Sequence, residues 1–304
     1  MQRRLLVLLL VAAAPFATAQ DVPYCGDEGV WLQILGSGGT DLDDQRGGAS
    51  YLVWIDENVR LMVDVGSAAA LRFDQAGAAF ADLDAIVFTK LQARSLVDFP
   101  SLIEGSRTAM RERPLPVFGP AVPGGDSVSA MIHRLMGPEG AFPRLAPFLD
   151  VPSPAGYRIS VRDVTAIGMR RWSEFGTRNI ALSAVPVNHG DIPALAWRVD
   201  IGDVSLVFAG SFSNQNGVIA GFAKDADALI VHHAILNSAR GASLDYFATP
   251  TELARVATLA NVRMLVLGHR TTPTLGVESI SRDFIEEHYS GPLIFADEME
   301  CWGL

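Results

Sequence analysis

The order of strand and helix patterns along the chain constrains the fold more than any other feature. Short apolar or alternating runs predict strands, at residues 31–35, 51–55, 59–63, 84–88, 115–120, 180–187, 194–199, 204–208, 228–231, 264–267 and 292–295. Helical periodicity predicts helices at residues 68–79, 96–104, 127–135, 251–260 and 277–288. Strands cluster first, helices then alternate with strands, and this order occurs twice. We therefore predict an α/β protein with two sheets packed face to face and helices outside, a four-layer αββα sandwich.

The composition fits a large buried core. Of the 304 residues, 49% are hydrophobic and only 19% are charged, which argues against a disordered chain. Residues 137–176 are rich in Pro and Gly and weakly periodic, so we interpret them as an insertion over one edge. Because no clear linker or short repeat occurs, we predict a single domain over residues 20–304.

The N-terminal segment has the pattern of a secretory signal peptide. Arg3 and Arg4 precede an apolar run over residues 5–14 that is too short to span a bilayer. Ala-Thr-Ala at residues 17–19 is a small-x-small cleavage site. We predict a signal peptide over residues 1–19 and a periplasmic or secreted protein; an uncleaved anchor is the alternative.

The charge balance is acidic. Without Arg3 and Arg4, 22 of the 24 basic residues remain against 34 acidic ones, a net charge of −12 (22 − 34). Such a charge repels polyanions, and no basic stripe or polybasic patch interrupts it. We therefore expect neither nucleic acid nor a membrane surface as a partner.

The two cysteines lie near opposite ends of the predicted mature chain, at Cys25 and Cys301. In an oxidising compartment this pair favours one disulfide that ties the ends together, with two unrelated thiols as the alternative. Closing so long a loop would stabilise the fold by roughly 4–5 kcal/mol in a chain-entropy model.

Four of the six histidines follow apolar strand runs. His189 follows residues 184–187, His232 and His233 follow residues 229–231, and His269 follows residues 265–268. Because the carboxyl ends of sheet strands meet at one edge, these histidines indicate a shared site.

From residue 31 to residue 302 the chain resembles the metallo-β-lactamase-fold hydrolases, specifically a periplasmic proteobacterial branch. Segments such as Leu-Gly-Ser-Gly-Gly at 35–39, Val-Asn-His-Gly at 187–190 and Val-Leu-Gly-His at 266–269 carry the resemblance through their order and spacing. The other matching segments are residues 61–66, 82–86, 114–120, 193–198, 207–210, 228–233 and 295–297.

The resemblance implies up to two metal ions held by seven side chains, and this chain differs at five of them. Where the family has Thr/Ser-His-x-His-x-Asp-His, residues 89–95 read Thr-Lys-Leu-Gln-Ala-Arg-Ser. The resemblance places Lys90, Gln92, Arg94 and Ser95 at four ligand positions, Ser211 at the bridging aspartate, and His189 and His269 at the two that match.

Two cations in this segment oppose metal binding. Lys90 and Arg94 would repel a divalent ion, by roughly 8 kcal/mol each at 4 Å and an effective dielectric near 20. A catalytic zinc site needs about three protein donors, and without a metal there is no acidified water. We therefore predict no cofactor, with residual zinc binding through His189, His233 and His269 as the alternative.

The roles of the two cations remain open at this stage. They could pair with Asp64, Asp98 or Asp191, or together hold a carboxylate, phosphate or sulfate. Arg94 could also lower the proton affinity of Lys90, as a general base requires.

The predicted pocket comprises Lys90, Gln92, Arg94, Ser95, His189, Ser211, His233 and His269, with Asp64 and Asp98 behind them. We predict a secreted pseudoenzyme or a metal-independent binder of a small, anionic ligand. The first alternative is a hydrolase acting on an ester, lactam, phosphate or sulfate through a residual or rearranged site. A further alternative is an interaction protein whose partner covers the cleft.

Overall fold

The computed structural model describes residues 25–177 and 179–304. The predicted signal peptide at residues 1–19 lies outside them. Within the described residues, no helix is long and apolar enough to cross a membrane.

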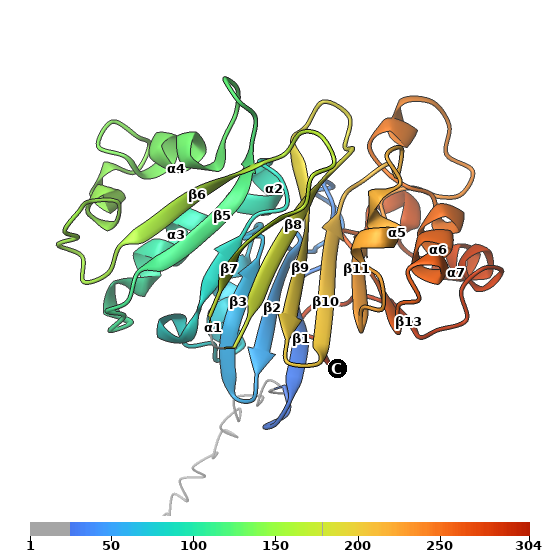
Figure 1. Cartoon of the computed structure of the whole chain (residues 1–304), viewed down its shortest axis with the longest axis horizontal. Helices are drawn as coiled ribbons and strands as arrows, with labels where there is room; N and C mark the ends of the chain where they lie inside the picture. Colours follow the sequence, from blue (N-terminus) through green and yellow to red (C-terminus); the bar gives the residue numbers. More distant parts are fainter. Residues whose placement is uncertain (1–24, 178) are drawn as a thin grey trace, which may run out of the picture.

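Two seven-stranded sheets lie face to face (Figure 1). The first has the order β14-β1-β2-β3-β4-β5-β6 and the second the order β13-β12-β11-β10-β9-β8-β7. The strands of the first sheet are β1 (Val30–Gly36), β2 (Ser50–Ile55), β3 (Asn58–Val63), β4 (Ala85–Val87), β5 (Leu115–Ala121), β6 (Ile159–Thr165) and β14 (Cys301–Gly303). Those of the second are β7 (Trp172–Gly176), β8 (Ala181–Val187), β9 (Ala194–Ile201), β10 (Val204–Gly210), β11 (Ala228–His232), β12 (Met264–Gly268) and β13 (Leu293–Phe295).

Each sheet is half antiparallel and half parallel. In the first, β14 to β3 pair antiparallel and β3 to β6 pair parallel. In the second, β7 to β10 pair antiparallel and β10 to β13 pair parallel. Within each parallel half, helices connect successive strands, because two parallel strands need a long crossover connection.

The helices cover the outer faces of the two sheets. They are α1 (Ala69–Gln75), α2 (Ala93–Leu96), α3 (Phe99–Gly105), α4 (Val128–Met136), α5 (Val218–Phe222), α6 (Pro250–Leu259) and α7 (Glu278–Glu286). One apolar cluster, including Leu32 and Trp197, fills the space between the sheets. A second packs α1 and α3 on the first sheet, and a third packs α5 and α6 on the second. The structure therefore confirms the predicted αββα sandwich.

The interpretation of residues 137–176 as an insertion was wrong in part. β6 and β7 lie in this segment and extend the two sheets at their edges. An edge strand has one partner and a more exposed surface, so its polar residues mask the period-2 pattern. Asp163 of β6, for example, is exposed.

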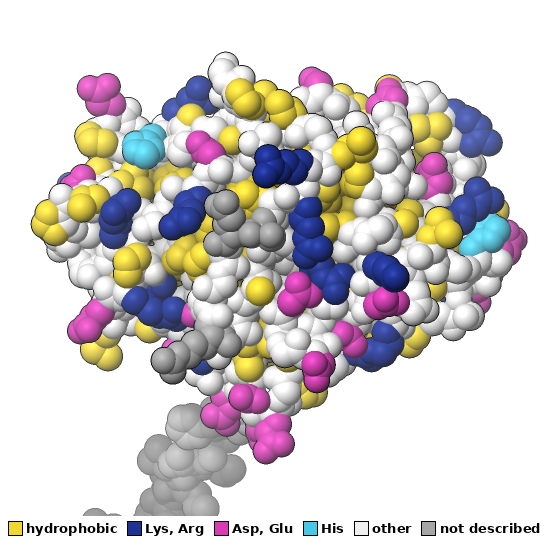
Figure 2. Space-filling view, viewed as in Figure 1, with side chains coloured by type: hydrophobic (Ala, Val, Ile, Leu, Met, Phe, Trp, Pro, Cys, Tyr) yellow, Lys and Arg dark blue, Asp and Glu magenta, His cyan; other side chains and the backbone are white. Residues whose placement is uncertain are grey.

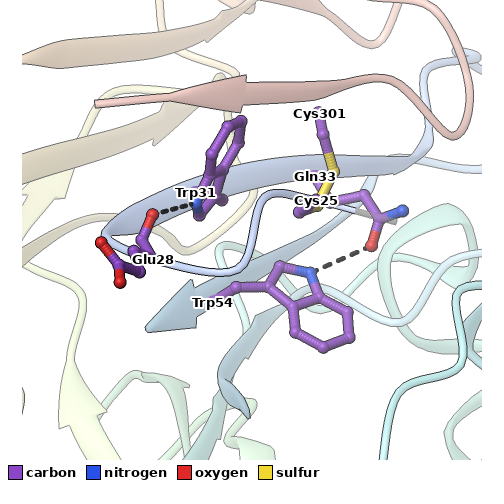
Figure 3. The surroundings of a disulfide bond; sticks show 6 residues. All are labelled: Cys25, Glu28, Trp31, Gln33, Trp54 and Cys301. Carbon is purple, nitrogen blue, oxygen red and sulfur yellow. Dashed lines mark hydrogen bonds between the residues drawn. A yellow bond between two sulfur atoms is a disulfide. The ribbon is translucent and has the colours of Figure 1, made fainter. Parts of the chain in front are cut away.

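The predicted disulfide is present. Cys25 and Cys301 are bonded, so the first described residue is tied to β14 at the edge of the first sheet. Figure 3 shows the bond beside Gln33, which pairs with Cys301 between β1 and β14, and the Trp54 indole donates to Gln33 Oε1 at 3.0 Å.

Candidate active site

The strands of both sheets end at a common edge, and the polar side chains there form the candidate site. They are Asp64 after β3, Lys90 after β4, His189 after β8, Ser211 after β10, His232 at the end of β11 and His269 after β12.

Strand register makes three of these residues neighbours. Gly210 of β10 pairs with Val231 of β11, so Ser211 and His232 both lie one residue beyond that pair. His232 in turn pairs with Gly268 of β12, which precedes His269. Their contact therefore follows from the backbone pairing of parallel strands.

Lys90 reaches this group from the other sheet. The N–H of Leu195 in β9 donates to the Thr89 carbonyl at 2.8 Å, and Lys90 forms a backbone bridge with Ala194. This crossing places Lys90 Nζ 2.7 Å from Ser211 Oγ and 3.3 Å from His232 Nδ1. Since Ser211 Oγ is also 2.7 Å from His232 Nδ1, the three side chains form a closed triangle of hydrogen-bonding groups.

The structure places His232, rather than the predicted His233, in this group. Side chains alternate along β11: Ala228 and Ile230 belong to the cluster between the sheets, and Leu229 and Val231 to the cluster under the helices. His232 therefore faces the other sheet and Lys90.

His233 lies on the opposite side. Its Nε2 is 2.9 Å from Ser281 Oγ of α7 and its ring packs on Phe295. The period-2 alternation of β11 was the sequence feature that could have separated the two histidines.

Two further imidazoles border the triangle. The ring of His269 stacks on that of His232, with 4.3 Å between centroids and an interplanar angle of 6°. His189 Nδ1 lies 2.8 Å from the carbonyl oxygen of Tyr246, which only accepts, so Nδ1 carries the hydrogen and Nε2 is left as an acceptor.

The group is desolvated, and this sets its protonation. Lys90, Ser211 and His232 are only 1%, 2% and 3% exposed. Burial lowers the pKa of Lys90 to about 8, and the Asp64 carboxylate acts in the opposite direction. Burial, and after it the charge of Lys90, lowers the pKa of His189 to about 4 and holds those of His232 and His269 well below the ordinary value. All three imidazoles are therefore neutral at neutral pH.

The predicted carboxylates do not pair with the cations. Asp64 accepts from the N–H and hydroxyl of Thr89 at 2.8 and 2.6 Å, and burial raises its pKa to about 6. Asp98 accepts from the Ala70 N–H at 3.0 Å, and Asp191 from the Tyr246 hydroxyl at 3.0 Å. Within residues 25–177 and 179–304, none of the ion pairs includes Lys90 or Arg94.

The rest of the 90–95 segment turns away from the triangle. Arg94, half-buried at the start of α2, donates to Ser67 Oγ at 3.1 Å and to the carbonyl of Asp41. Ser95 is buried beside Asp64, and the half-buried Gln92 is the residue before α2. We expected Arg94 to lower the proton affinity of Lys90. The pKa of Lys90 is lowered as predicted, but the cause is burial and not the charge of Arg94.

A cavity of about 400 Å³ opens beside His189. Its wall includes Asn188 and Gly190, the two neighbours of His189 in the chain, and Gly168 of the β6–β7 turn. The cavity therefore adjoins the candidate site on the side of β8.

The side chains present do not fit a two-metal centre. The imidazoles of His232 and His269 stack on each other and His189 lies near both, but the charge of Lys90 acts on all three and would repel a divalent ion. In the described part of the chain, no three or more His, Cys, Asp or Glu side chains are grouped so as to hold a metal ion. Lys90 instead supplies a positive charge at the centre of the site.

A search of protein-family models finds no match to this chain. Among curated proteins, it is 29% identical over 254 residues to ribonuclease Z of Mycobacterium sp. strain KMS, covering 80% of this chain and 84% of that protein. The ribonuclease Z proteins of strains JLS and MCS match equally well.

This similarity to a ribonuclease contradicts two predictions from the sequence. The prediction of a pseudoenzyme or anion binder is wrong, and the alternative of a hydrolase fits better. The exclusion of nucleic acid as a partner is also wrong. Net charge is an average over the whole surface, whereas the field at the site depends on nearby groups: after burial, the charges of Lys90 and Arg94 lower the pKa of His269, while Asp64 raises that of Lys90.

Solved structures share the architecture at low sequence identity. The protein YhfI of Bacillus subtilis, described as a metallo-β-lactamase-fold protein, has a TM-score of 0.69 and 18% identity over 90% of this chain and 98% of its own. Human tRNase Z, short form, has a TM-score of 0.68 and 14% identity with the same coverage. Zn²⁺-bound PqqB from Methylobacterium extorquens has a TM-score of 0.63 and 12% identity over 90% of this chain and all of its own, so one neighbour of this architecture holds zinc. With the two mixed sheets and outer helices described above, these likenesses show that the chain has the metallo-β-lactamase fold.

Proposed function

We propose that this protein is a hydrolase of phosphodiesters of the RNA type, acting through a rearranged, metal-independent site. The observation that carries the proposal is the placement of Lys90 Nζ, 2.7 Å from Ser211 Oγ and 3.3 Å from His232 Nδ1. A lysine, a hydroxyl and an unprotonated imidazole nitrogen in mutual contact supply a charge for the transition state, a nucleophile and groups that can accept its proton.

The relatives support a phosphodiester as the substrate. The curated relative is a ribonuclease, and one structural neighbour is a tRNase. A phosphodiester carries a negative charge that grows along the reaction coordinate, so a buried cation stabilises the transition state more than the ground state.

The surface charge does not oppose this substrate class. Figure 2 shows Lys and Arg side chains over several parts of one face, with Asp and Glu side chains among them. A polyanion can therefore contact the basic side chains of this face although the chain carries a net charge of −10.

The proposed reaction does not require a metal ion. Lys90, Gln92, Arg94, Ser95 and Ser211 replace five ligands of the pattern that the sequence resembles, and the two cations oppose a divalent ion. We propose that Lys90 takes over the charge that a metal would supply.

The first experiment measures hydrolysis of bis(p-nitrophenyl) phosphate and of a single-stranded RNA by untagged protein in excess chelator. We expect turnover without metal, and a fall of about 100-fold or more in kcat/KM for Lys90→Met, because the transition state loses its buried cation. Lys224→Met is the matched control, since Lys224 is the only other lysine and is exposed.

Two outcomes would contradict the proposal. Activity that appears only with stoichiometric zinc would exclude metal independence, and a Lys90→Met variant as active as the wild type would exclude the role of the lysine. Metal analysis of the active protein distinguishes the two.

We also propose that residues 1–19 direct export to the periplasm, as in the periplasmic proteobacterial branch that the sequence resembles. The Cys25–Cys301 disulfide supports this location, because such bonds persist in oxidising compartments. N-terminal sequencing of protein from a cell fractionation would detect a mature chain that begins at Gln20.

A further inference from the structure

We propose that Ser211 is the nucleophile of this hydrolase and forms a covalent phosphoseryl intermediate, with Lys90 as its general base. The inference rests on the proposed phosphodiester hydrolase function and adds the identity of the attacking atom. Ser211 matches no serine-hydrolase motif, since Gly-x-Ser-x-Gly is absent from the chain.

The backbone presents Ser211 to the site in a fixed position. Gly210, the last residue of β10, has a φ of +61°, and the register of β10 against β11 shifts between Phe208 and Gly210. The chain therefore leaves the sheet sharply at Gly210 and directs the next side chain toward the other sheet. A Cβ at Gly210 would lie 3.2 Å from Thr89 Cβ, so this turn is packed directly against the segment that carries Lys90.

The hydroxyl of Ser211 has two partners, and each can accept its proton. With Lys90 charged, the ammonium donates to Oγ and the hydroxyl donates to His232 Nδ1. With Lys90 neutral, the amine lone pair accepts the serine proton, while an amine N–H donates to His232 Nδ1 at 3.3 Å. The neutral form is the reactive one, since a nucleophile then faces a base within hydrogen-bond distance, and the proton taken from Ser211 turns Lys90 into the buried cation that stabilises the transition state.

Burial favours this assignment of the base. Because Lys90 is 1% exposed, its pKa falls to about 8 and its amine is available near neutral pH. The imidazole of His232 is the weaker base, because burial, and after it the charge of Lys90, holds its pKa well below the ordinary value.

The reaction then proceeds in two steps, formation and hydrolysis of the phosphoseryl group. Ser211 Oγ attacks phosphorus, its proton moves to Lys90 Nζ, the bond from phosphorus to the leaving ribose oxygen breaks, and that oxygen takes the proton from Lys90. A water then attacks the phosphoseryl group and gives one proton to Lys90, and the bond from phosphorus to Oγ breaks. Oγ recovers the proton from Lys90, and a phosphate monoester leaves.

A serine with only a structural role would form no bond to phosphorus, so the test detects the covalent intermediate itself. Full-length wild-type protein is mixed with bis(p-nitrophenyl) phosphate, quenched in acid during turnover, digested and analysed by mass spectrometry. We expect a phosphoryl adduct on the peptide that contains Ser211, and a burst of about one p-nitrophenol per protein if hydrolysis of the adduct is slower than its formation.

Two substitutions make the test specific. Ser211→Ala should lose the adduct and lower kcat by roughly 1,000-fold or more. Ser213→Ala is the matched control, because Ser213 is a buried serine two residues away whose Oγ has no partner among the described residues. This variant should still form the adduct on Ser211 and should keep the kcat of the wild type. Circular dichroism and melting curves confirm that each variant is folded, and Ser211→Cys, which retains a nucleophile, should again form a covalent adduct.

The outcomes separate this inference from the proposed function. If the wild type hydrolyses the diester but no adduct forms on Ser211 and Ser211→Ala turns over within about tenfold of it, Ser211 is not the nucleophile and the hydrolase proposal stands. If the wild type hydrolyses neither the diester nor RNA, both proposals are overturned.

Discussion

At the scale of single residues, Lys90 determines how activity depends on pH. The groups that face it are Asp64, Ser211 and His232, with His189 and His269 beyond them. If neutral Lys90 is the base, kcat should rise about tenfold per pH unit below its pKa and level off above about 8. A pH profile of diester hydrolysis from pH 5.5 to 10 measures this.

Substituting Asp64 tests the assignment of that pKa. The Asp64 carboxylate raises the pKa of Lys90, so Asp64→Asn should move the midpoint of the profile to lower pH. Asp203→Asn, at an exposed turn after β9, is the control and should leave the midpoint in place. A rate that falls as pH rises through 8 would instead show that the ammonium form is the active one.

At the scale of elements, the end of β10 positions the proposed nucleophile. Gly210→Ala would force a side chain into a left-handed conformation and against Thr89, at about 1–2 kcal/mol for the backbone alone. We expect lower stability and a fall in kcat, because Ser211 moves relative to Lys90. Denaturant unfolding and steady-state kinetics measure the two effects.

Gly217 provides a matched control for this glycine. Its φ is +62°, but a Cβ there would meet no atom within 4 Å. Gly217→Ala should therefore show a comparable backbone penalty with kcat unchanged. Equal losses of kcat in the two variants would show that the position of Ser211 does not depend on the turn at Gly210.

At the scale of the whole molecule, the Cys25–Cys301 bond closes a loop of 276 residues in sequence separation. Such a bond restricts the unfolded chain, so reduction or the double substitution to Ser should lower the free energy of unfolding by roughly 2–5 kcal/mol. KM should not change, because the bond lies at the edge of the first sheet beside Trp31 and Trp54 (Figure 3). Equal unfolding midpoints with and without reductant would contradict this.

The whole-molecule charge shows where composition misleads. The chain carries 34 acidic and 24 basic residues, which led to the exclusion of nucleic acid. The field that a substrate meets depends on the few charges within a Debye length, roughly 10 Å at 0.1 M salt. At this site those charges are Lys90 and Arg94 together with Asp64 and Asp191, so the net charge of the whole chain does not give the sign of the field there.

The sequence by itself determined the layers of the fold and the strand ends that carry the candidate site, whereas the edge strands β6, β7 and β14 were not predicted. Alternation along β11 and its neighbours is a local property of the backbone, and it orients side chains such as Ile230 and Leu229 to opposite faces without reference to the rest of the chain. For the same reason the sequence placed polar residues such as His189 and His269 after strands.

Only the tertiary structure decided which of these residues meet. Lys90 lies 121 residues from Ser211 and 142 from His232, and it reaches them because the Thr89 carbonyl accepts from Leu195 in the opposite sheet. Arg94, four residues along, is held away by Ser67 and Asp41. Such contacts depend on how two sheets pack and how loops cross between them, and no periodicity within a segment encodes that.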